Sequence, residues 1–293
     1  MNAIPEDEVL AAAGDVIGRG GQGTVYAVTG LRLPGVEHTR LAYKKYRTSI
    51  SPSLLTVLVA RRMALPPHVR RRLDESTAWP LGVVQRDGVV TGVLMRLVPS
   101  AFTHSLISPS GRQLRDVLRD AQFLMVSGER IGRLRLPVVD VVNRLTVCLE
   151  FSRVVDLVHG MGVVLGDINA KNAVIAIDKG PRVMLLDCDS YRVVSWDGGE
   201  RQLNTPDWDV PGGDVLSQGT DRYKLGLFVL RVLVSDSLTR DPERARDVLG
   251  TRGTRLLRTA LAPDVRARPT ANEWIELLTA LVGQQAVGTR RPR

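Results

Sequence analysis

The feature that most limits how this chain can fold is a change of hydrophobic pattern after its first third. Residues 14–46 alternate between apolar and polar positions as β-strands do, and "VVQRDGVVTGVLM" (83–95) sets Asp87 and Gly88 between two such runs, which predicts a hairpin. Later segments carry apolar residues at helical spacing, most clearly over residues 136–162. Strands gathered before helices predict an α+β fold.

This division predicts the domain organisation. We expect a small β-rich lobe over residues 1–98 and a larger helical lobe over 99–283, followed by a basic tail over 284–293 that is expected to be disordered. The small lobe is expected to hold one main helix, in "SPSLLTVLVARRMAL" (51–65), which Pro66-Pro67 ends. Further helices are predicted at 111–125, 136–162, 219–236, 243–260 and 270–282, and short strands within 163–175 and 182–194.

Composition excludes several classes of protein. The chain has 293 residues and a formal charge of +9, with arginine clusters at 61–73 and 243–258 that suit acidic proteins, nucleic acid or nucleotide phosphates. We interpret them as solvated faces, and because aromatic residues make up only 4% of the chain, nucleic acid is an unexpected partner. Acids near the start and charges that interrupt the apolar runs predict a cytoplasmic protein without a membrane partner.

A glycine cluster lies inside the β-rich region. "GRGGQGTV" (18–25) spaces Gly18, Gly20 and Gly23 as G-x-G-x-x-G, and glycines let backbone amides approach phosphates and permit positive φ. A dinucleotide fold needs the last glycine to open a helix, whereas "TVYAV" continues as a strand. The pattern therefore favours a strand-loop-strand flap over phosphates, although such a turn also serves as an ordinary hairpin.

Charged and amide side chains follow at suggestive distances. Lys44 stands in a β run 21 residues after Gly23, where a point charge could hold phosphate oxygens. In "VVLGDINAKNAVI" (163–175), Asp167 could orient a hydroxyl and accept its proton, and Asn172 could ligate a divalent cation. Asp187 follows an apolar strand as a hard oxygen ligand suited to Mg²⁺.

In this order and spacing the motifs resemble those of the eukaryotic-like protein kinase family, over roughly residues 14–282. "GDIN..N" and "LLDCDSYRV" look closest to a divergent bacterial branch. The resemblance implies a two-lobed protein-kinase-like fold, with ATP and Mg²⁺ as cofactors and a protein substrate with a Ser or Thr acceptor. Acidic protein surfaces are a further partner that the basic charge would suit.

The resemblance assigns residue roles. Asp167, Lys44 and Lys171 would be catalytic, and Asn172 and Asp187 would be the metal ligands. Asp221 would brace the catalytic loop, Arg268 would take the place of the family's closing arginine, and His159 would be structural. The nucleotide would meet the following residues: Gly18, Gly20, Gly23, Val25, Ala42, Lys44, Met95, Arg96, Leu97 and Val98.

The chain also departs from the family pattern. Leu165 and Gly166 replace the usual His-Arg, and the usual D-F-G segment is Asp187-Cys188-Asp189. The small-lobe helix lacks the glutamate that pairs with the strand lysine, because no acid occurs between Lys44 and Asp74. Asp74 or Glu75 could take that role if the helix lies differently, or Lys44 could pair elsewhere.

Three rival functions remain open at this point. The first is a pseudokinase, a scaffold that recruits partners with or without nucleotide, which the missing helix acid and the D-C-D segment favour. The second is a small-molecule phosphotransferase, against which Thr205-Pro206 argues because it resembles the substrate-docking segment of serine/threonine kinases. The third is nucleic-acid binding, which predicts affinity that falls steeply with salt.

Overall fold

The computed structural model describes residues 3–36, 40–48, 51–107, 113–133, 138–194, 205–211 and 215–288. The chain divides into two compact units. Unit 1 comprises Met1–Pro99 and Leu186–Tyr191, and unit 2 comprises Ser100–Leu185 and Arg192–Arg293. The assignment of residues 186–191 to the second domain was therefore wrong: this segment packs with unit 1, where the ring of Tyr191 meets Trp79 edge-on at 5.9 Å.

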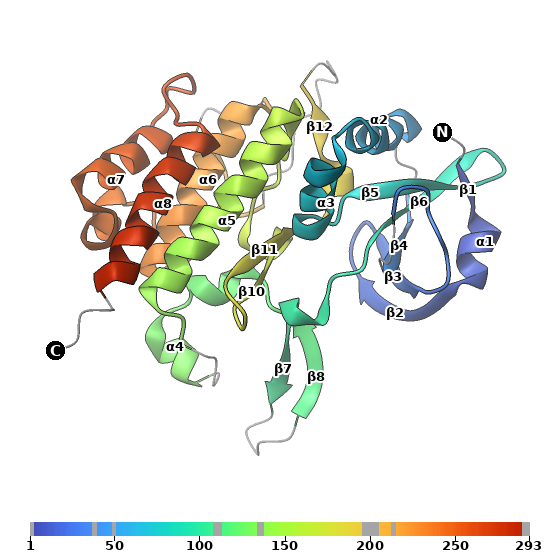
Figure 1. Cartoon of the computed structure of the whole chain (residues 1–293), viewed down its shortest axis with the longest axis horizontal. Helices are drawn as coiled ribbons and strands as arrows, with labels where there is room; N and C mark the ends of the chain where they lie inside the picture. The colour runs from blue at the N-terminus through green and yellow to red at the C-terminus, as the bar shows by residue number, and fades with distance from the viewer. Residues whose placement is uncertain are drawn as a thin grey trace. The chain divides into compact units, whose positions relative to one another are not determined.

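The described part of unit 1 is built on a six-stranded sheet with the order β1-β5-β6-β4-β3-β2 (Figure 1). Its strands are β1 (Ile4–Pro5), β2 (Ala13–Arg19), β3 (Gly23–Val28), β4 (Leu41–Tyr46), β5 (Pro80–Arg86) and β6 (Val89–Arg96). Neighbours are antiparallel except β1 and β5. The predicted hairpin is confirmed, since Asp87 and Gly88 join β5 to β6 with positive φ at both positions, as a tight turn of matching twist requires.

Unit 1 holds more helix than expected. The predicted helix is α2 (Pro52–Met63), with proline at its first position, and it is followed at once by α3 (Pro67–Ser76). Pro67 cannot continue α2, but its fixed φ suits the first turn of a new helix. A short helix, α1 (Glu6–Ala11), adds Val9 to a core cluster that includes Tyr43 and Leu94. The expectation of one main helix was therefore too low.

Four long helices form the body of unit 2: α5 (Val141–Gly160), α6 (Gln218–Val234), α7 (Arg246–Ala260) and α8 (Ala271–Gly288). A shorter helix, α4 (Gly128–Arg133), precedes them. Helix α5 packs against α6 and α8, and α6 packs against α7 (Figure 1). Helix α8 continues through Gly288, so residues 284–288 of the predicted disordered tail are helical, and residues 289–293 lie outside the described residues.

Short strands complete unit 2. They pair as β10 (Ala173–Ala176) with β11 (Arg182–Leu185) and as β9 (Val163–Val164) with β12 (Arg192–Val193). The helix predicted at 111–125 was wrong. Its first part is strand β8 (Gln113–Leu118), paired with β7 (Thr103–Ile107), and only the short 3₁₀ helix η2 (Ala121–Met125) follows. Helical spacing is a weak preference that pairing with a neighbouring strand overrides.

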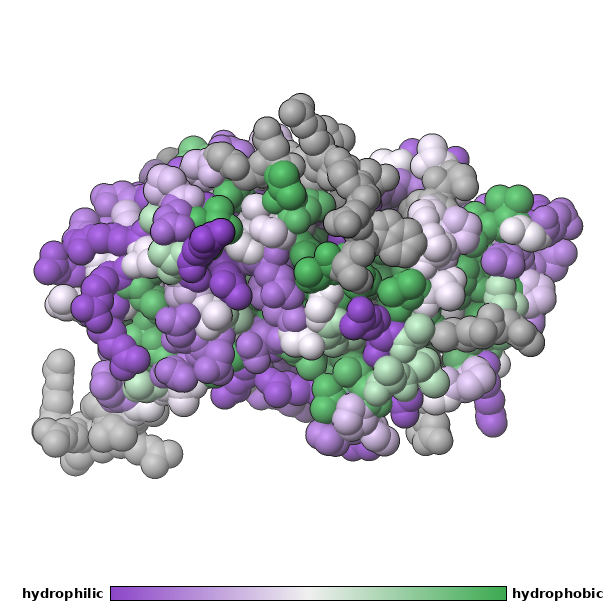
Figure 2. Space-filling view, turned by 90° about the horizontal axis from the view of Figure 1, so that it is seen from above, coloured by the Kyte–Doolittle hydropathy of each residue, from purple (hydrophilic) through white to green (hydrophobic). Residues whose placement is uncertain are grey.

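The arginine cluster at 243–258 lies mainly on helix α7. Figure 2 shows hydrophilic atoms predominating at the end of unit 2 that carries this helix, where Arg246, Arg252, Arg255 and Arg258 are exposed. Glu243 pairs with both Arg246 and Arg258, which neutralises part of the charge locally. Among the residues that the structure describes, no helix is both long and apolar enough to span a bilayer.

Candidate active site

The glycine cluster forms the turn of the β2-β3 hairpin in unit 1. The N–H of Gly20 donates to the carbonyl of Gly23 at 3.0 Å. A Cβ at Gly23 would lie 2.2 Å from the carbonyl oxygen of Lys45, so this glycine is required by the close approach of β4. Gly18, Gly20 and Gly23 do not use the positive φ that glycine permits. A Cβ placed at Gly20 or Gly21 would meet no described heavy atom within 4 Å, so the backbone of the turn is open.

Lys44 lies in the middle of this sheet, on β4, where it pairs with Val25 of β3 and Val93 of β6. Its side chain is only 6% exposed. Within unit 1 the ammonium donates to Gln22 Oε1 at 3.0 Å, to Asp187 Oδ1 at 3.1 Å and to Asp189 Oδ1 at 3.0 Å. An ammonium has three N–H donors, so all of them have partners. We call Gln22, Lys44, Tyr46, Asp187 and Asp189 the lysine cluster.

The two acids of the lysine cluster differ in exposure. Asp187 has left-handed backbone geometry (φ 53°) and precedes the 3₁₀ turn η4 (Cys188–Ser190), which brings both carboxylates to Lys44. The side chain of Asp187 is 52% exposed, whereas that of Asp189 is 2% exposed. Asp189 Oδ2 also accepts a hydrogen bond from the Tyr46 hydroxyl at 2.8 Å. Sequence reasoning assigned no role to Asp189.

The electrostatics of the cluster favour a charged lysine. Burial alone would lower the pKa of Lys44, but the charges of Asp189 and Asp187 outweigh it and raise that pKa above its usual range. Burial and the charge of Asp189 also raise the pKa of Tyr46, so its phenol stays protonated and remains a donor. The Lys44 ammonium is therefore a fixed positive charge held between the carboxylates of Asp187 and Asp189.

Asp74 does not serve as the acidic partner of Lys44. Its carboxylate binds the buried guanidinium of Arg62 through two bonds, Nε to Oδ1 at 2.6 Å and Nη2 to Oδ2 at 2.5 Å. Glu75 is exposed and makes no bond to Lys44 within the described residues. The suggestion that either acid replaces the missing helix glutamate was wrong, because Asp74 forms an ion pair with Arg62 on α2 and Glu75 does not bond to Lys44.

The residues expected to meet an adenine ring belong to neighbouring strands of unit 1. Ala42 on β4 and Met95 on β6 are buried partners in the sheet, and Val25 on β3 is half-buried. The N–H of Leu97 donates to the carbonyl of Arg40 at 2.7 Å, so this donor is already used. The carbonyl of Leu97 and the backbone groups of Arg96 and Val98 then remain as candidates for the adenine edge.

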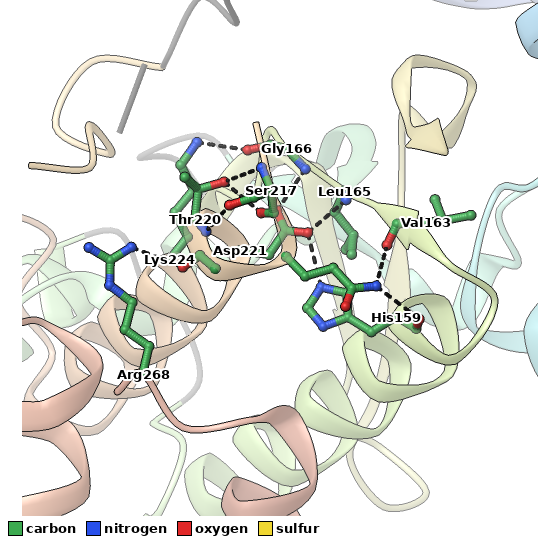
Figure 3. Close-up of polar contacts among 11 residues, drawn as sticks. His159, Val163, Leu165, Gly166, Ser217, Thr220, Asp221, Lys224 and Arg268 are labelled. Atoms are coloured by element: carbon green, nitrogen blue, oxygen red, sulfur yellow. Dashed lines mark hydrogen bonds and ion pairs between the residues drawn. The ribbon is translucent and has the colours of Figure 1, made fainter. Parts of the chain in front are cut away.

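In unit 2, the loop that follows β9 is held by a buried acid. Asp221 on α6 is fully buried and accepts the N–H of Leu165 on Oδ2 and that of Gly166 on Oδ1, both at 2.8 Å (Figure 3). His159, at the end of α5, adds a contact from Nε2 to Oδ2 at 3.0 Å. Gly166 has φ of 75°, which explains why glycine stands there.

Sequence reasoning missed a second brace of the same loop. Lys224, one turn after Asp221 on α6, is buried and donates from Nζ to the carbonyl of Gly166 at 2.7 Å (Figure 3). Burial lowers the pKa of Lys224. A lysine inside the apolar stretch "KLGLFVL" (224–230) was the available signal. Both polar groups of the Gly166 backbone are therefore bonded to α6.

Asp167 follows this braced backbone. Its Oδ2 accepts a bond from Asn172 Nδ2 at 2.9 Å, and its Oδ1 accepts one from the Thr205 hydroxyl, also at 2.9 Å. Asn169 Nδ2 donates to Thr205 Oγ1 at 3.2 Å, and Asn169 Oδ1 caps the 3₁₀ turn at Lys171 and Asn172. The two expected residues Asp167 and Asn172 are thus in direct contact.

Lys171, the third expected catalytic residue, is exposed. The structure relates its charge to Asp120: burial raises the pKa of Asp120, and the positive charge of Lys171 acts against that rise. The Lys171 backbone N–H bonds to Asn169 at 2.9 Å, which fixes its place in the turn. Its exposed side chain leaves the ammonium accessible to a ligand.

Two oxygen atoms in the described residues fit a hard cation. Because Asn172 donates its amide Nδ2 to Asp167, its Oδ1 points elsewhere and accepts no bond from a described residue. Asp187 Oδ2 likewise accepts none from this part of the chain, since Lys44 binds Oδ1. Mg²⁺ takes such oxygens together with water and substrate phosphates. No group of three or more His, Cys, Asp or Glu side chains that could hold a metal occurs where the structure describes the chain.

Arg268, assigned to the place of a closing arginine, is buried and bonds to backbone carbonyls. Its guanidinium donates to Ala262, Gly219 and Pro263, at 3.1, 2.9 and 3.4 Å (Figure 3 shows the bond near α6). It also lies over the ring of Tyr223, with 5.1 Å to the centroid. Burial lowers the pKa of Arg268. Its role in unit 2 is to join the start of α6 to the segment before α8.

The chain was also compared with known proteins. No protein-family model matches it, and a search of curated proteins returned no match. What the chain does must therefore be inferred from its own residues.

Proposed function

We propose that the chain is a divergent cytoplasmic protein kinase of two-lobed fold that transfers the γ-phosphoryl group of ATP to a Ser or Thr hydroxyl of a protein substrate. The observation that carries this proposal is the hydrogen bond of 2.9 Å from the Thr205 hydroxyl to Asp167 Oδ1. An acceptor hydroxyl needs the same contact, because a carboxylate orients the oxygen and takes its proton.

The roles of the loop residues follow from their contacts. As the acceptor oxygen bonds to the γ-phosphorus, Asp167 takes the hydroxyl proton, the bond from that phosphorus to the bridging oxygen breaks, and ADP leaves. Asn172 fixes the carboxylate of Asp167, and Asp221 fixes the backbone that carries it. Catalysis of this kind consists of positioning and charge stabilisation, to which pre-organised hydrogen bonds contribute most.

The phosphates would meet positive charge and open backbone. Lys44 would hold nonbridging oxygens, the turn at Gly20 and Gly21 would approach them, and Lys171 would add charge from the loop. Asp187 Oδ2 and Asn172 Oδ1 would each offer an oxygen to Mg²⁺, because the bonds to these two side chains use their other atoms. Bound Mg²⁺ would neutralise charge that develops on the transferred phosphoryl group and on the leaving group.

A second function, a nucleotide-binding scaffold, is favoured by one observation. The three donors of Lys44 are satisfied within the protein, and α2 offers no acid to rearrange them. A scaffold would bind Mg-ATP at the lysine cluster and recruit partners without using Asp167. Its biological role would survive loss of the Asp167 carboxylate.

The test is phosphate incorporation by mass spectrometry. Purified, phosphatase-treated protein is incubated with Mg-ATP, in parallel with Asp167→Asn, and phosphosites are mapped. The proposal predicts sites on Ser or Thr in the parent that are absent from the variant. No incorporation by either protein, together with a rise in melting temperature on adding Mg-ATP, would instead establish the scaffold.

A further inference from the structure

The buried ammonium of Lys44 needs a permanent counter-charge, and α2 does not provide it. A buried charge without a partner strongly destabilises a fold. The sequence of α2, "PSLLTVLVARRM", contains no acid, and the nearest following acid, Asp74, is bound by Arg62. Within the described residues, the charges that meet Lys44 are those of Asp187 and Asp189.

Of these two acids, Asp189 is the one placed to be the permanent ion-pair partner of Lys44. Its carboxylate is 2% exposed and has both oxygens close to the ammonium, Oδ1 at 3.0 Å and Oδ2 at 2.9 Å. Asp187 presents one oxygen to Lys44 and is half exposed, so its other oxygen can bind a cation while the ion pair with Lys44 stays intact. Asp189 therefore serves as the counter-charge of Lys44, and Asp187 has an oxygen to spare for a cation.

Local structure fixes Asp189 in place. Tyr46 and Lys44 stand two residues apart on β4, so both side chains leave the same face of the sheet and both bind this carboxylate. The turn that carries Asp189 is closed by bonds from the Ser190 N–H and hydroxyl to the carbonyl of Asp187. Cys188, in the same turn, is fully buried.

We propose that Asp189 is the positioning residue of the lysine cluster, which holds the Lys44 ammonium ready for nucleotide phosphates in place of an acid on α2. This role rests on the proposed kinase function. It assigns to the third position of the D-C-D segment a purpose that the glycine usual there could not serve. Asp189 itself touches no substrate and acts through Lys44.

The first readout is the titration of Lys44, measured by NMR on protein with ¹⁵N-labelled lysine side chains. The chain has few lysines to assign: Lys44, Lys45, Lys171, Lys179 and Lys224. The ammonium is surrounded by Gln22, Tyr46, Asp187 and Asp189. The Asp189→Asn substitution removes one of the two negative charges beside Lys44 and keeps the size and shape of the side chain. The pKa of Lys44 should fall, because one of the two charges that raise it is removed. Lys45, paired with Glu6, is the internal control, and an unchanged Lys44 titration would overturn the proposal.

The second readout is phosphotransfer. Asp189→Asn should lower kcat by about 10²-fold, the scale of a misplaced catalytic group. Asp189→Glu keeps the charge, so Lys44 should titrate as in the parent, and kcat should be higher than in Asp189→Asn but lower than in the parent. If Asp189→Asn does not fold, Asp189→Glu is the variant that tests the proposal. Tyr46→Phe, which keeps the ion pair, is the matched control and should lose less activity than Asp189→Asn.

The outcomes separate the two proposals. A shifted Lys44 titration with parental kcat in Asp189→Asn would overturn the positioning role and leave the kinase function standing. A parent protein that transfers no phosphate would overturn the kinase function, and the positioning role with it, whatever the titration shows.

Discussion

Oδ1 of Asp221 accepts the backbone N–H of Gly166 at 2.8 Å, across 55 residues of sequence. The same carboxylate binds the N–H of Leu165 through its other oxygen, and both bonds are buried. The brace depends on the backbone N–H groups of Leu165 and Gly166 and not on the side chains at these positions. The position of Asp167 follows from this contact.

Asp221→Asn should therefore destabilise the protein. The new amide group would set an N–H against the N–H of Leu165 or Gly166 and leave a buried donor without a partner, which costs about 1–3 kcal/mol. The free energy of unfolding, measured with urea, should fall by that amount. Asp156→Asn, at an exposed site on α5, is the control and should change it little. Equal effects of the two variants would contradict the brace.

Two glycines of the β2-β3 turn should behave differently. Gly23→Ala would push a Cβ against the Lys45 carbonyl at 2.2 Å and should lower stability by about 1–3 kcal/mol. Gly21→Ala meets no described atom within 4 Å, so stability should be unchanged while the apparent Kd for Mg-ATP rises, because the added methyl group would face the phosphates. Thermal unfolding and nucleotide titration test the pair, and a Gly21→Ala variant with parental affinity would argue against a phosphate flap.

Gln22 is the neutral partner of Lys44 and should compete with the nucleotide. A phosphate oxygen needs one of three occupied N–H groups, and the amide is the uncharged ligand among them. Gln22→Ala should tighten Mg-ATP binding by about tenfold, the lower end of the worth of one hydrogen bond to a charged group. Gln22→Glu, which adds a third acid, should weaken it. Calorimetry that shows the reverse order would exclude this competition.

Glu6 makes the stability of unit 1 depend on pH. It accepts a bond from the Tyr43 hydroxyl at 2.7 Å and pairs with Lys45 and Arg86. Burial acts to raise the pKa of Glu6, but these partners outweigh it and lower the pKa below the ordinary value of 4.5. The stabilisation is therefore complete above pH 4.5 and is lost as the pH falls through the lowered pKa.

Glu6→Gln tests this linkage. The variant should be less stable than the parent at about pH 7, and the difference should shrink as the pH is lowered below 4.5, because the parent alone loses the contribution. Glu8→Gln, exposed on the same helix, is the control. Urea unfolding at several pH values measures both, and a difference that stays constant with pH would rule out a role for Glu6 ionisation.

The sequence predicts local features well where a strong signal stands alone. Asp87-Gly88 marks its hairpin, and the leucine pattern marks α2. Residues 113–118 were misassigned because their partner strand lies earlier in the chain and strand pairing overrides helical spacing. The continuation of helix after Pro66-Pro67 was missed because proline both ends one helix and begins the next.

The candidate site likewise has contacts that the sequence could predict and contacts that it could not. Asp167 and Asn172 are five residues apart, and their contact could be expected from that spacing. The pairing of Lys44 with Asp189 spans 145 residues, and no periodic pattern encodes it. The motif spacing assigned Gly23 to a phosphate flap, but it could not show that the close approach of β4 also requires a residue without a side chain there.

The most direct test of the kinase function is the rate of phosphate incorporation into Ser or Thr at saturating Mg-ATP, compared between the parent and Asp167→Asn. Both proteins should show the same Mg-ATP-dependent rise in melting temperature, so that nucleotide binding is matched. We expect the rate to fall by about 10²- to 10⁴-fold in the variant, the range for loss of a general base. Equal rates in the two proteins would contradict the assignment of Asp167 and the kinase function with it.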